Sequence, residues 1–407
     1  MPPESSGGGA EKHGYQLANY LASVGHEVHF VGKVSKGAEF NSNVVVHSVP
    51  PSRGVIPPRT SFFGWVMKHF FGNILSAMVA LRVFGTNPNR FDIVHCHGAL
   101  SALVLEKTVG RRVPVVYTMH DASPWIVSYS GVSERAFRKL AYLLIDVPCL
   151  RCVHKTIAVS PALRDEAKRF GTPESRAVFI PNAVWMPPSE ARKTGTTDGN
   201  GYALFVGQLV PRKNVEVLVE AAKGLPDVRV IVVGDGPSKL KLTGLSRRLD
   251  VEEKVFFAGY VNDVALSNYY RGAACFVFPS LAEGLSISLF EAMSYGLPAI
   301  AARLNVYDGL LEDGVNCLLF NGVDAAALER LIRQLSSDHK LAAKIAENAT
   351  SLVKAHFTWR IVGEQVVSVY EKLAPQSTSP QPRAMAEKLV NREDPRVVET
   401  VETGIGE

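Results

Sequence analysis

The sequence predicts an α/β fold built on parallel sheets, and three observations support this prediction. Apolar runs rich in β-branched residues alternate with helical patterns from one end of the chain to the other. A polar stretch rich in Pro, Gly and Thr at 186–200 separates these runs into two groups, as a linker between domains does. The chain has 407 residues, enough for two domains with sizeable cores. We therefore expect Rossmann-like domains over 1–185 and 201–358.

Each domain is expected to contribute six strands. The strand-like runs of the first domain are 27–31, 44–46, 92–96, 114–118, 156–159 and 177–180. Those of the second are 202–206, 228–233, 255–257, 275–278, 299–301 and 317–320. The chain opens with a glycine-rich loop and passes directly into a helix at 10–24. An open parallel sheet usually starts with a central strand, so we expect the sequence to begin after the first strand, with a gap in the middle of the N-terminal sheet.

The net charge of +5 is distributed unevenly along the chain. Residues 1–190 contain 20 Lys and Arg against 13 Asp and Glu, whereas residues 191–407 contain 24 against 26. A basic first half favours an anionic acceptor or a phospholipid surface as partner, and a solvated basic face explains it equally well. We expect no nucleic-acid partner.

The most apolar segment, 61–82, is interrupted by Lys68, His69 and Asn73, so a membrane-spanning helix does not fit it. A helix packed in the core and an interfacial amphipathic helix both remain open, and 62–84 is the candidate for contact with a membrane surface. No signal peptide is visible, and five cysteines in a chain of this length do not form a disulfide framework. We expect a cytoplasmic protein, with association at the inner membrane surface left open.

Two further segments have simple interpretations. Cys149, Cys152 and His154 form a C-x2-C-x-H cluster, but no fourth zinc ligand accompanies them, so incidental cysteines at a helix end are preferred. Residues 375–407 are rich in Pro, Ser and Gln and then in charge, with few apolar anchors. This tail is expected to be disordered.

A pair of glutamates carries the most information about function. A buried strand stops at Pro279 and a helix begins near Ser286, so Glu283 precedes the helix and Glu291 lies on it. The amides of residues 284–287 lack helical partners and have the positive end of the helix dipole behind them, which suits an anionic ligand. Carboxylates beside such a site would repel a bare phosphate and are better placed to accept hydroxyl hydrogens. A phosphate with several hydroxyl groups describes a nucleotide sugar.

Other motifs lie at the ends of expected strands or at the beginning of helices. A structural turn, a solvated basic turn or a structural histidine is the alternative explanation for each, and His120 is favoured over that alternative because it lies beyond the carboxyl end of a strand. They are the glycine loop 7–9, His120 with the lower-weighted His95 and His97, the cations Arg212 and Lys213, and the turn 234–236. The glycine loop is not a dinucleotide-binding fingerprint, because Lys12 stands where that motif requires glycine.

Taken in order, the glycine loop, the strand-end histidine, the Arg-Lys pair, the Gly-Asp-Gly turn and the two glutamates resemble the retaining glycosyltransferases of family 4. The resemblance covers residues 2–374 and is densest over 201–300. Supporting similarities lie at 158–160, 180–183, 312–316 and 357–360. The resemblance implies the GT-B fold, in which two Rossmann-like domains face a central cleft. It also implies that a C-terminal helix at 359–374 crosses back to the N-terminal domain.

The resemblance further implies a role for each matching residue. The catalytic group would be His120 near the transferred sugar, Glu283 on the sugar hydroxyls, and Lys213 with Arg212 on the diphosphate. Glu291 would accept the ribose hydroxyls. The full set of implied donor contacts is Gly8, Gly9, Gly284, Leu285, Ser286, Ile287, Glu291, Gly234, Asp235, Gly236, Tyr260 and Val261, the last five bordering the base.

The implied activity is transfer of a hexosyl-type group, with retention, from a UDP- or GDP-linked sugar to a glycan or lipid-linked acceptor hydroxyl. The sequence contains no Asp-x-Asp motif, which agrees with a metal-independent reaction without a cofactor. Gln208 replaces the Arg that the family usually carries after the strand, and Arg212 follows four residues later. Two alternatives stay open: a nucleotide-sugar epimerase of the same fold, and a catalytically impaired nucleotide-sugar-binding protein.

Overall fold

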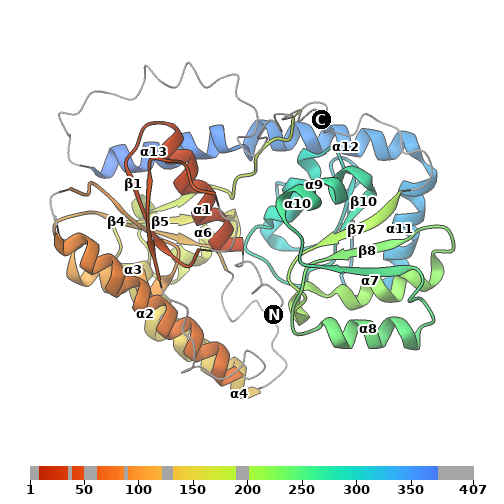
Figure 1. Ribbon diagram of the computed structural model, residues 1–407, viewed down its shortest axis with the longest axis horizontal. Helices are drawn as coiled ribbons and strands as arrows, with labels where there is room; N and C mark the ends of the chain where they lie inside the picture. Colours follow the sequence, from red (N-terminus) through yellow and green to blue (C-terminus); the bar gives the residue numbers. More distant parts are fainter. Residues whose placement is uncertain are drawn as a thin grey trace, which may run out of the picture.

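The computed structural model describes residues 9–34, 39–49, 62–86, 90–121, 132–188 and 201–374, and these residues form two α/β halves (Figure 1). Gly8, most of the predicted linker 186–200 and the predicted tail 375–407 lie outside the described residues. The exact domain boundaries therefore stay a prediction. Every strand pairing in both halves is parallel, as the sequence predicts.

The C-terminal half contains a six-stranded sheet in the order β12-β11-β10-β7-β8-β9. Its strands are β7 (Tyr202–Val206), β8 (Val230–Val233), β9 (Val255–Gly259), β10 (Ala273–Phe278), β11 (Ala299–Ala302) and β12 (Leu318–Phe320). Its helices are α7 (Val215–Ala221), α8 (Lys239–Arg248), α9 (Asp263–Gly272), α10 (Ile287–Ser294), α11 (Ala325–Ser337) and α12 (His339–His356). All six expected strands are confirmed.

Helices cover both faces of this sheet (Figure 1), which explains why its strands are apolar throughout. In β10, Cys275 and Val277 point to one buried cluster, whereas Phe276 and Phe278 point to the other. Alternate residues of a strand face opposite sides of a sheet, so β10 is buried on both sides. Its carboxyl end, where the glutamate loop begins, is thereby held rigidly.

The N-terminal half contains the other six expected strands in two separate sheets. The strands β1 (Val28–Gly32) and β2 (Val44–Ser48) pair with each other, and β3 (Val94–Cys96), β4 (Val115–Met119), β5 (Lys155–Ala158) and β6 (Ala177–Phe179) form a second sheet in that order. The helices are α1 (Gly9–Ser23), α2 (Phe62–Thr86), α3 (Ala99–Thr108), α4 (Val132–Ala141), α5 (Val147–Cys152) and α6 (Pro161–Arg169). The described strands of this half fall into two sheets, and the expected missing strand between them stays a prediction.

The last helix, α13 (Trp359–Leu373), lies against the N-terminal half as the family resemblance implies (Figure 1). The crossing begins where Val184 N donates to Phe357 O at 2.8 Å, which joins two distant segments of the chain. Gly363 faces the ring of Tyr20 so closely that no side chain would fit there. Because of this glycine, α13 packs directly on α1 and buries Trp359 between them.

Helix α2 is packed on one side and exposed on another, and its contact with a membrane surface stays a prediction. Ala77 and Phe84 are buried, whereas Phe70, Phe71 and Met78 are exposed. The helix therefore packs through one side and presents apolar side chains on another. Among the residues that the structure describes, none of the helices has the length and apolar character needed to cross a bilayer.

Asp146 ends a short π-helical turn, Tyr142–Asp146, between α4 and α5. Burial, with a smaller contribution from the charge of Asp121, raises the pKa of Asp146 from 3.8 to about 7. The folded state therefore holds a proton that the unfolded state releases above pH 4. By linkage, this group favours the folded state at low pH, and its contribution is lost as pH rises from about 4 to 7.

We expect Asp146→Asn to be more stable than the wild type at pH 8, by on the order of 2–4 kcal/mol, because the amide stays neutral at every pH. The advantage should shrink toward pH 4. Denaturant unfolding at pH 4, 6 and 8 measures it, with Asp308→Asn on the exposed surface as the matched control. An advantage that does not change with pH would contradict the proposed proton.

Candidate active site

Glu283 lies in the loop between β10 and α10 and meets two cations from the turn after β7. Lys213 Nζ is 2.7 Å from Glu283 Oε1, and Arg212 Nη1 is 3.4 Å from Glu283 Oε2. Strands β7 and β10 are neighbours in a parallel sheet, so the loops after their carboxyl ends lie side by side. The structure thus brings together three of the four side chains predicted to be catalytic.

Lys213 and Glu283 are largely removed from water, whereas Arg212 is partly exposed. Lys213 is 9% exposed and Glu283 is 8% exposed. Burial opposes the charge of Glu283, but the facing Lys213 and Arg212 outweigh it and hold the pKa of the Glu283 carboxyl below its usual value. Burial also lowers the pKa of Lys213, against the attraction of Glu283. At neutral pH one carboxylate faces two cations, which leaves an excess positive charge for an anionic ligand.

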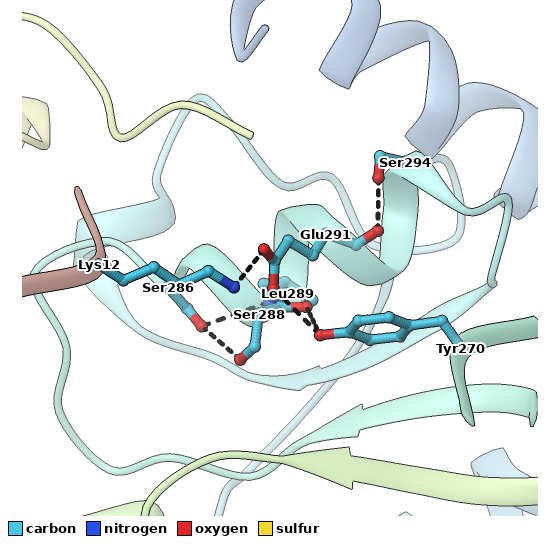
Figure 2. A network of polar contacts seen from close by, with 7 residues as sticks. All are labelled: Lys12, Tyr270, Ser286, Ser288, Leu289, Glu291 and Ser294. Atoms are coloured by element: carbon cyan, nitrogen blue, oxygen red, sulfur yellow. Dashed lines mark hydrogen bonds and ion pairs between the residues drawn. The ribbon is translucent and has the colours of Figure 1, made fainter. Parts of the chain in front are cut away.

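Helix α10 begins at Ile287, four positions after Glu283. Ser286 is its N-cap, and the Ser286 side chain accepts a hydrogen bond from Leu289 N at 3.4 Å and lies 3.2 Å from Ser288 Oγ (Figure 2). Asn182 from the N-terminal half donates to Leu285 O at 2.8 Å. The predicted anion-binding loop, 284–287, is therefore held between the two halves of the molecule.

Gly284 contacts the predicted catalytic histidine through its backbone. A Cβ at this position would fall well inside the van der Waals distance of the His120 carbonyl oxygen. His120 directly follows β4, so the end of that strand abuts the loop that carries Glu283. This close approach is possible only for glycine, and it brings His120 to the same place as the charged group around Glu283.

His120 belongs to a cluster of three imidazoles from three elements of the N-terminal half. His97 Nδ1 and His120 Nε2 are 2.9 Å apart, and the ring of His13 lies edge-on to both, with centroids at 5.5 Å and 5.1 Å. Burial lowers the pKa of His97 to about 4, and it lowers the pKa of His13 and His120 well below the usual value. All three rings are therefore neutral at pH 7. His97 was a lower-weighted candidate in the sequence, and no role was predicted for His13.

Glu291 projects from α10 toward the N-terminal half, where it meets a residue that the sequence analysis did not assign. Lys12 of α1 lies 2.6 Å from Glu291 Oε1, and Tyr270 OH donates to Glu291 Oε2 at 3.3 Å (Figure 2). Glu291 is 6% exposed, so this ion pair joins the two halves in a largely buried setting. Its only signal in the sequence is a cation one turn into the helix that follows the glycine loop.

The remaining predicted donor contacts lie at different distances from the charged group around Glu283. A Cβ on Gly9 would be 4.0 Å from Ile287 Cδ1, so the end of the glycine loop reaches the start of α10. The turn 234–236 follows β8 and packs on the loop after β7, where Leu209 N donates to Asp235 O at 2.9 Å. Tyr260 and Val261 follow β9, further along the same edge of the sheet, and Tyr260 is exposed.

The cysteine cluster shows no sign of a metal site. Cys149 is buried, Cys152 Sγ lies 3.6 Å from Cys149 O at the end of α5, and His154 pairs with Glu106 at 3.0 Å. These contacts agree with the interpretation as incidental cysteines. Within the described residues, the side chains grouped closely enough to hold a metal ion are His13, His97 and His120.

Comparisons with known proteins agree with this architecture. The family model for glycosyltransferase family 4 matches residues 7–184, and the model for glycosyl transferases group 1 matches residues 188–352. The chain is 28% identical over 386 residues to the phosphatidyl-myo-inositol mannosyltransferase of Mycobacterium tuberculosis, covering 90% of this chain and 94% of that protein. It is 26% identical over 328 residues to the alpha-monoglucosyldiacylglycerol synthase of Acholeplasma laidlawii, covering 75% and 79% respectively.

The fold is also found in solved structures. The crystal structure of Anabaena HepE in complex with UDP-glucose superimposes with a TM-score of 0.67 at 20% identity, covering 91% of this chain and 98% of that chain. The two family models follow each other along the chain and together span both halves of the structure. The chain therefore belongs to glycosyltransferase family 4 and has the GT-B fold.

Proposed function

We propose that the protein transfers a hexosyl group, with retention, from a UDP- or GDP-linked sugar to a hydroxyl of a glycan or lipid-linked acceptor, without a metal ion. The observation that carries the proposal is the convergence of Glu283, Lys213 and Arg212 at the N-terminus of α10. Two cations and the amides at the start of α10 suit a diphosphate, and a carboxylate suits sugar hydroxyls. Few other ligands need all three.

In the proposed reaction, the bond between the anomeric carbon and the phosphate oxygen breaks while a bond to the acceptor oxygen forms on the same face of the sugar. The departing phosphate takes the acceptor proton. Lys213, Arg212 and the amides of 284–287 stabilise the negative charge that develops on the diphosphate. Glu283 positions the sugar through its hydroxyls, and His120 borders the sugar from the N-terminal half.

Donor binding has a consequence for the ion pair between Lys12 and Glu291. If Glu291 accepts the two ribose hydroxyls, then Lys12, now 2.6 Å away, must share the carboxylate or leave it. Lys12 extends from the helix that follows the glycine loop, so a released ammonium group remains close to the donor phosphates. In the free protein, the ion pair between Lys12 and Glu291 therefore connects the two halves. In the donor complex, the ribose takes over part or all of this contact with Glu291.

The acceptor is proposed to be presented at the inner surface of a membrane, with the protein in the cytoplasm. Helix α4 and the π-helical turn after it expose Phe137, Leu140, Leu143 and Leu144, and the same segment carries Arg135, Arg138 and Lys139. Apolar side chains with interspersed cations bind anionic bilayers. Relatives named for glycolipid synthesis and for phosphatidyl-myo-inositol support a lipid acceptor.

A thermal-shift panel of UDP- and GDP-sugars tests the donor, because a ligand at 100 times its Kd stabilises the folded state by about 2.7 kcal/mol. One nucleotide sugar should raise the Tm, and Glu291→Gln should reduce that shift while Glu347→Gln, on the exposed surface of α12, should not. The stabilising donor is then incubated with vesicles that contain glycolipid acceptors, and the anomeric configuration of the product is read by NMR.

Four outcomes would contradict the proposal. An inverted product would remove retention, and an isomerised donor formed without acceptor would identify an epimerase. Donor binding without transfer to any acceptor would indicate a binding protein. Activity that disappears on treatment with a chelator and returns with Mg²⁺ would refute metal independence.

A further inference from the structure

We propose that His13, His97 and His120 form a binding site for one divalent transition-metal ion, with Zn²⁺ as the best-suited ion. The three imidazoles would supply three nitrogen ligands, and a water molecule would complete the tetrahedron. Nothing in the proposed transfer reaction needs this ion. The site is therefore an addition to the donor centre and not part of the diphosphate chemistry.

The geometry of the cluster is close to that of a three-histidine zinc site. One ligand nitrogen from each ring lies within 4.8 Å of the other two, and the shortest separation, between His97 Nδ1 and His120 Nε2, is 2.9 Å. A tetrahedral ion with Zn–N bonds of 2.0–2.1 Å places its ligand nitrogens about 3.3 Å apart. To complete the site, the His97 and His120 nitrogens must therefore separate by about 0.4 Å, and separations of up to 4.8 Å must close by about 1.5 Å.

An unpaired buried nitrogen is the second observation. His13 is 3% exposed, and its Nδ1 has no hydrogen-bond partner among the described residues. A buried polar atom without a partner is unfavourable, and such atoms in native structures often mark a missing ligand, water or ion. A metal ion bound through Nδ1 of His13 would satisfy this nitrogen.

The surroundings hold the ring of His97 in position. His95 contacts Tyr370 OH through Nδ1 and Thr118 Oγ1 through Nε2 at 2.6 Å, so both of its nitrogens are occupied. Its ring stacks on His97 with centroids 4.7 Å apart. A Cβ on Gly14 would lie 3.3 Å from the ring of His97, so a small residue in α1 lets that ring come close to His13. Such outer contacts orient metal ligands.

The ligand set selects among metal ions. Three imidazole nitrogens suit Zn²⁺, Cu²⁺, Ni²⁺ and Co²⁺, whereas Mg²⁺, Ca²⁺ and Mn²⁺ prefer oxygen ligands. Imidazole binds a metal ion in its neutral form. One ring of the His97–His120 pair carries the proton between them. On metal binding this proton would move to the other nitrogen of the same ring, so no proton has to leave the protein.

Calorimetric titration of the full chain with ZnCl₂ tests the site, on protein prepared without a histidine tag and stripped with a chelator. We expect one equivalent to bind. Loss of even an outer-shell partner typically lowers metal affinity about 10–100-fold, so His97→Ala should weaken binding at least about 100-fold. His339→Ala, an exposed histidine on α12, is the matched control and should bind as the wild type does.

Wild-type protein that binds no zinc, or a folded His97→Ala that binds it as tightly as the wild type, would overturn the proposal. If His97→Ala does not fold, wild-type crystals soaked in zinc give the answer without a variant. An anomalous peak between the three imidazoles supports the site, and a peak elsewhere or none refutes it.

A functional consequence follows that rests on the proposed transferase activity. An ion on His120 would occupy the ring that borders the transferred sugar, so zinc should inhibit transfer and a chelator should restore it. Zinc binding in a protein that transfers no sugar would refute the proposed function and leave the metal site standing. Sugar transfer by a protein that binds no zinc would refute the metal site and leave the proposed function standing.

Discussion

Glu283→Gln is expected to lower the rate of sugar transfer by at least about 100-fold, because preorganised charged contacts at a reaction centre contribute about that much each. The amide keeps the shape of the side chain but removes its charge. It can no longer accept hydrogen bonds from sugar hydroxyls with both oxygens, and it leaves Lys213 and Arg212 without the carboxylate that aligns them. Steady-state rates with the donor identified by thermal shift measure the effect.

The same substitution is expected to lower stability. Lys213 is 9% exposed, and removing one partner of a buried ion pair typically costs about 3–5 kcal/mol. A second variant separates folding from catalysis. In Lys213→Met combined with Glu283→Gln, no unpaired charge is buried, so stability should return toward that of the wild type while transfer stays lost.

Glu252→Gln, on the exposed surface before β9, is the matched control for the change of charge and should leave both quantities unchanged. Transfer by Glu283→Gln at close to the normal rate would remove the central assignment. Recovery of transfer in the double variant would show that the single variant had failed through folding alone.

Gly284→Ala is expected to reduce transfer about 100-fold, although it adds only one methyl group. The new Cβ would overlap the His120 carbonyl oxygen, so the loop before α10 or the end of β4 must move. Overpacking of this kind costs about 1–3 kcal/mol, and a shift of 1 Å at a reaction centre can cost about 100-fold in rate. Rates and thermal unfolding measure the two effects.

Gly244→Ala is the matched control, because a Cβ on this residue of α8 meets nothing within 4 Å. Alanine is favoured over glycine in a helix by about 1 kcal/mol, so this variant should be slightly more stable and fully active. A Gly284→Ala protein with normal rate and stability would show that the two halves do not hold this contact in solution.

Much of the fold could be predicted from local pattern. All twelve strands lie where the apolar runs place them, and α10 begins at Ile287, next to the expected Ser286. The reason is that burial on both faces of a parallel sheet requires continuous apolar runs, and that helix starts have short-range capping signals. The glutamate loop was recognisable for the same reason, since Glu283 and Glu291 are positioned by one strand end and one helix.

The partners of those glutamates could not be predicted in the same way. Arg212 and Lys213 were assigned through the family resemblance, and their ion pairs with Glu283 depend on β7 and β10 being neighbours in the sheet. Lys12 and Glu291 are separated by 279 positions in the chain, and no periodicity connects them. His13 and His97 likewise come together only because α1 packs over the ends of β3 and β4.

The sequence by itself determined the α/β class, the two halves, the strands and the loop that carries Glu283. Only the tertiary structure decided that Lys12 closes onto Glu291, that Gly284 abuts the end of β4, and that three histidines share one place. The physical reason is that secondary structure and capping depend on residues a few positions apart. Sites between domains depend on how two packed halves meet, and that arrangement is a property of the whole buried surface.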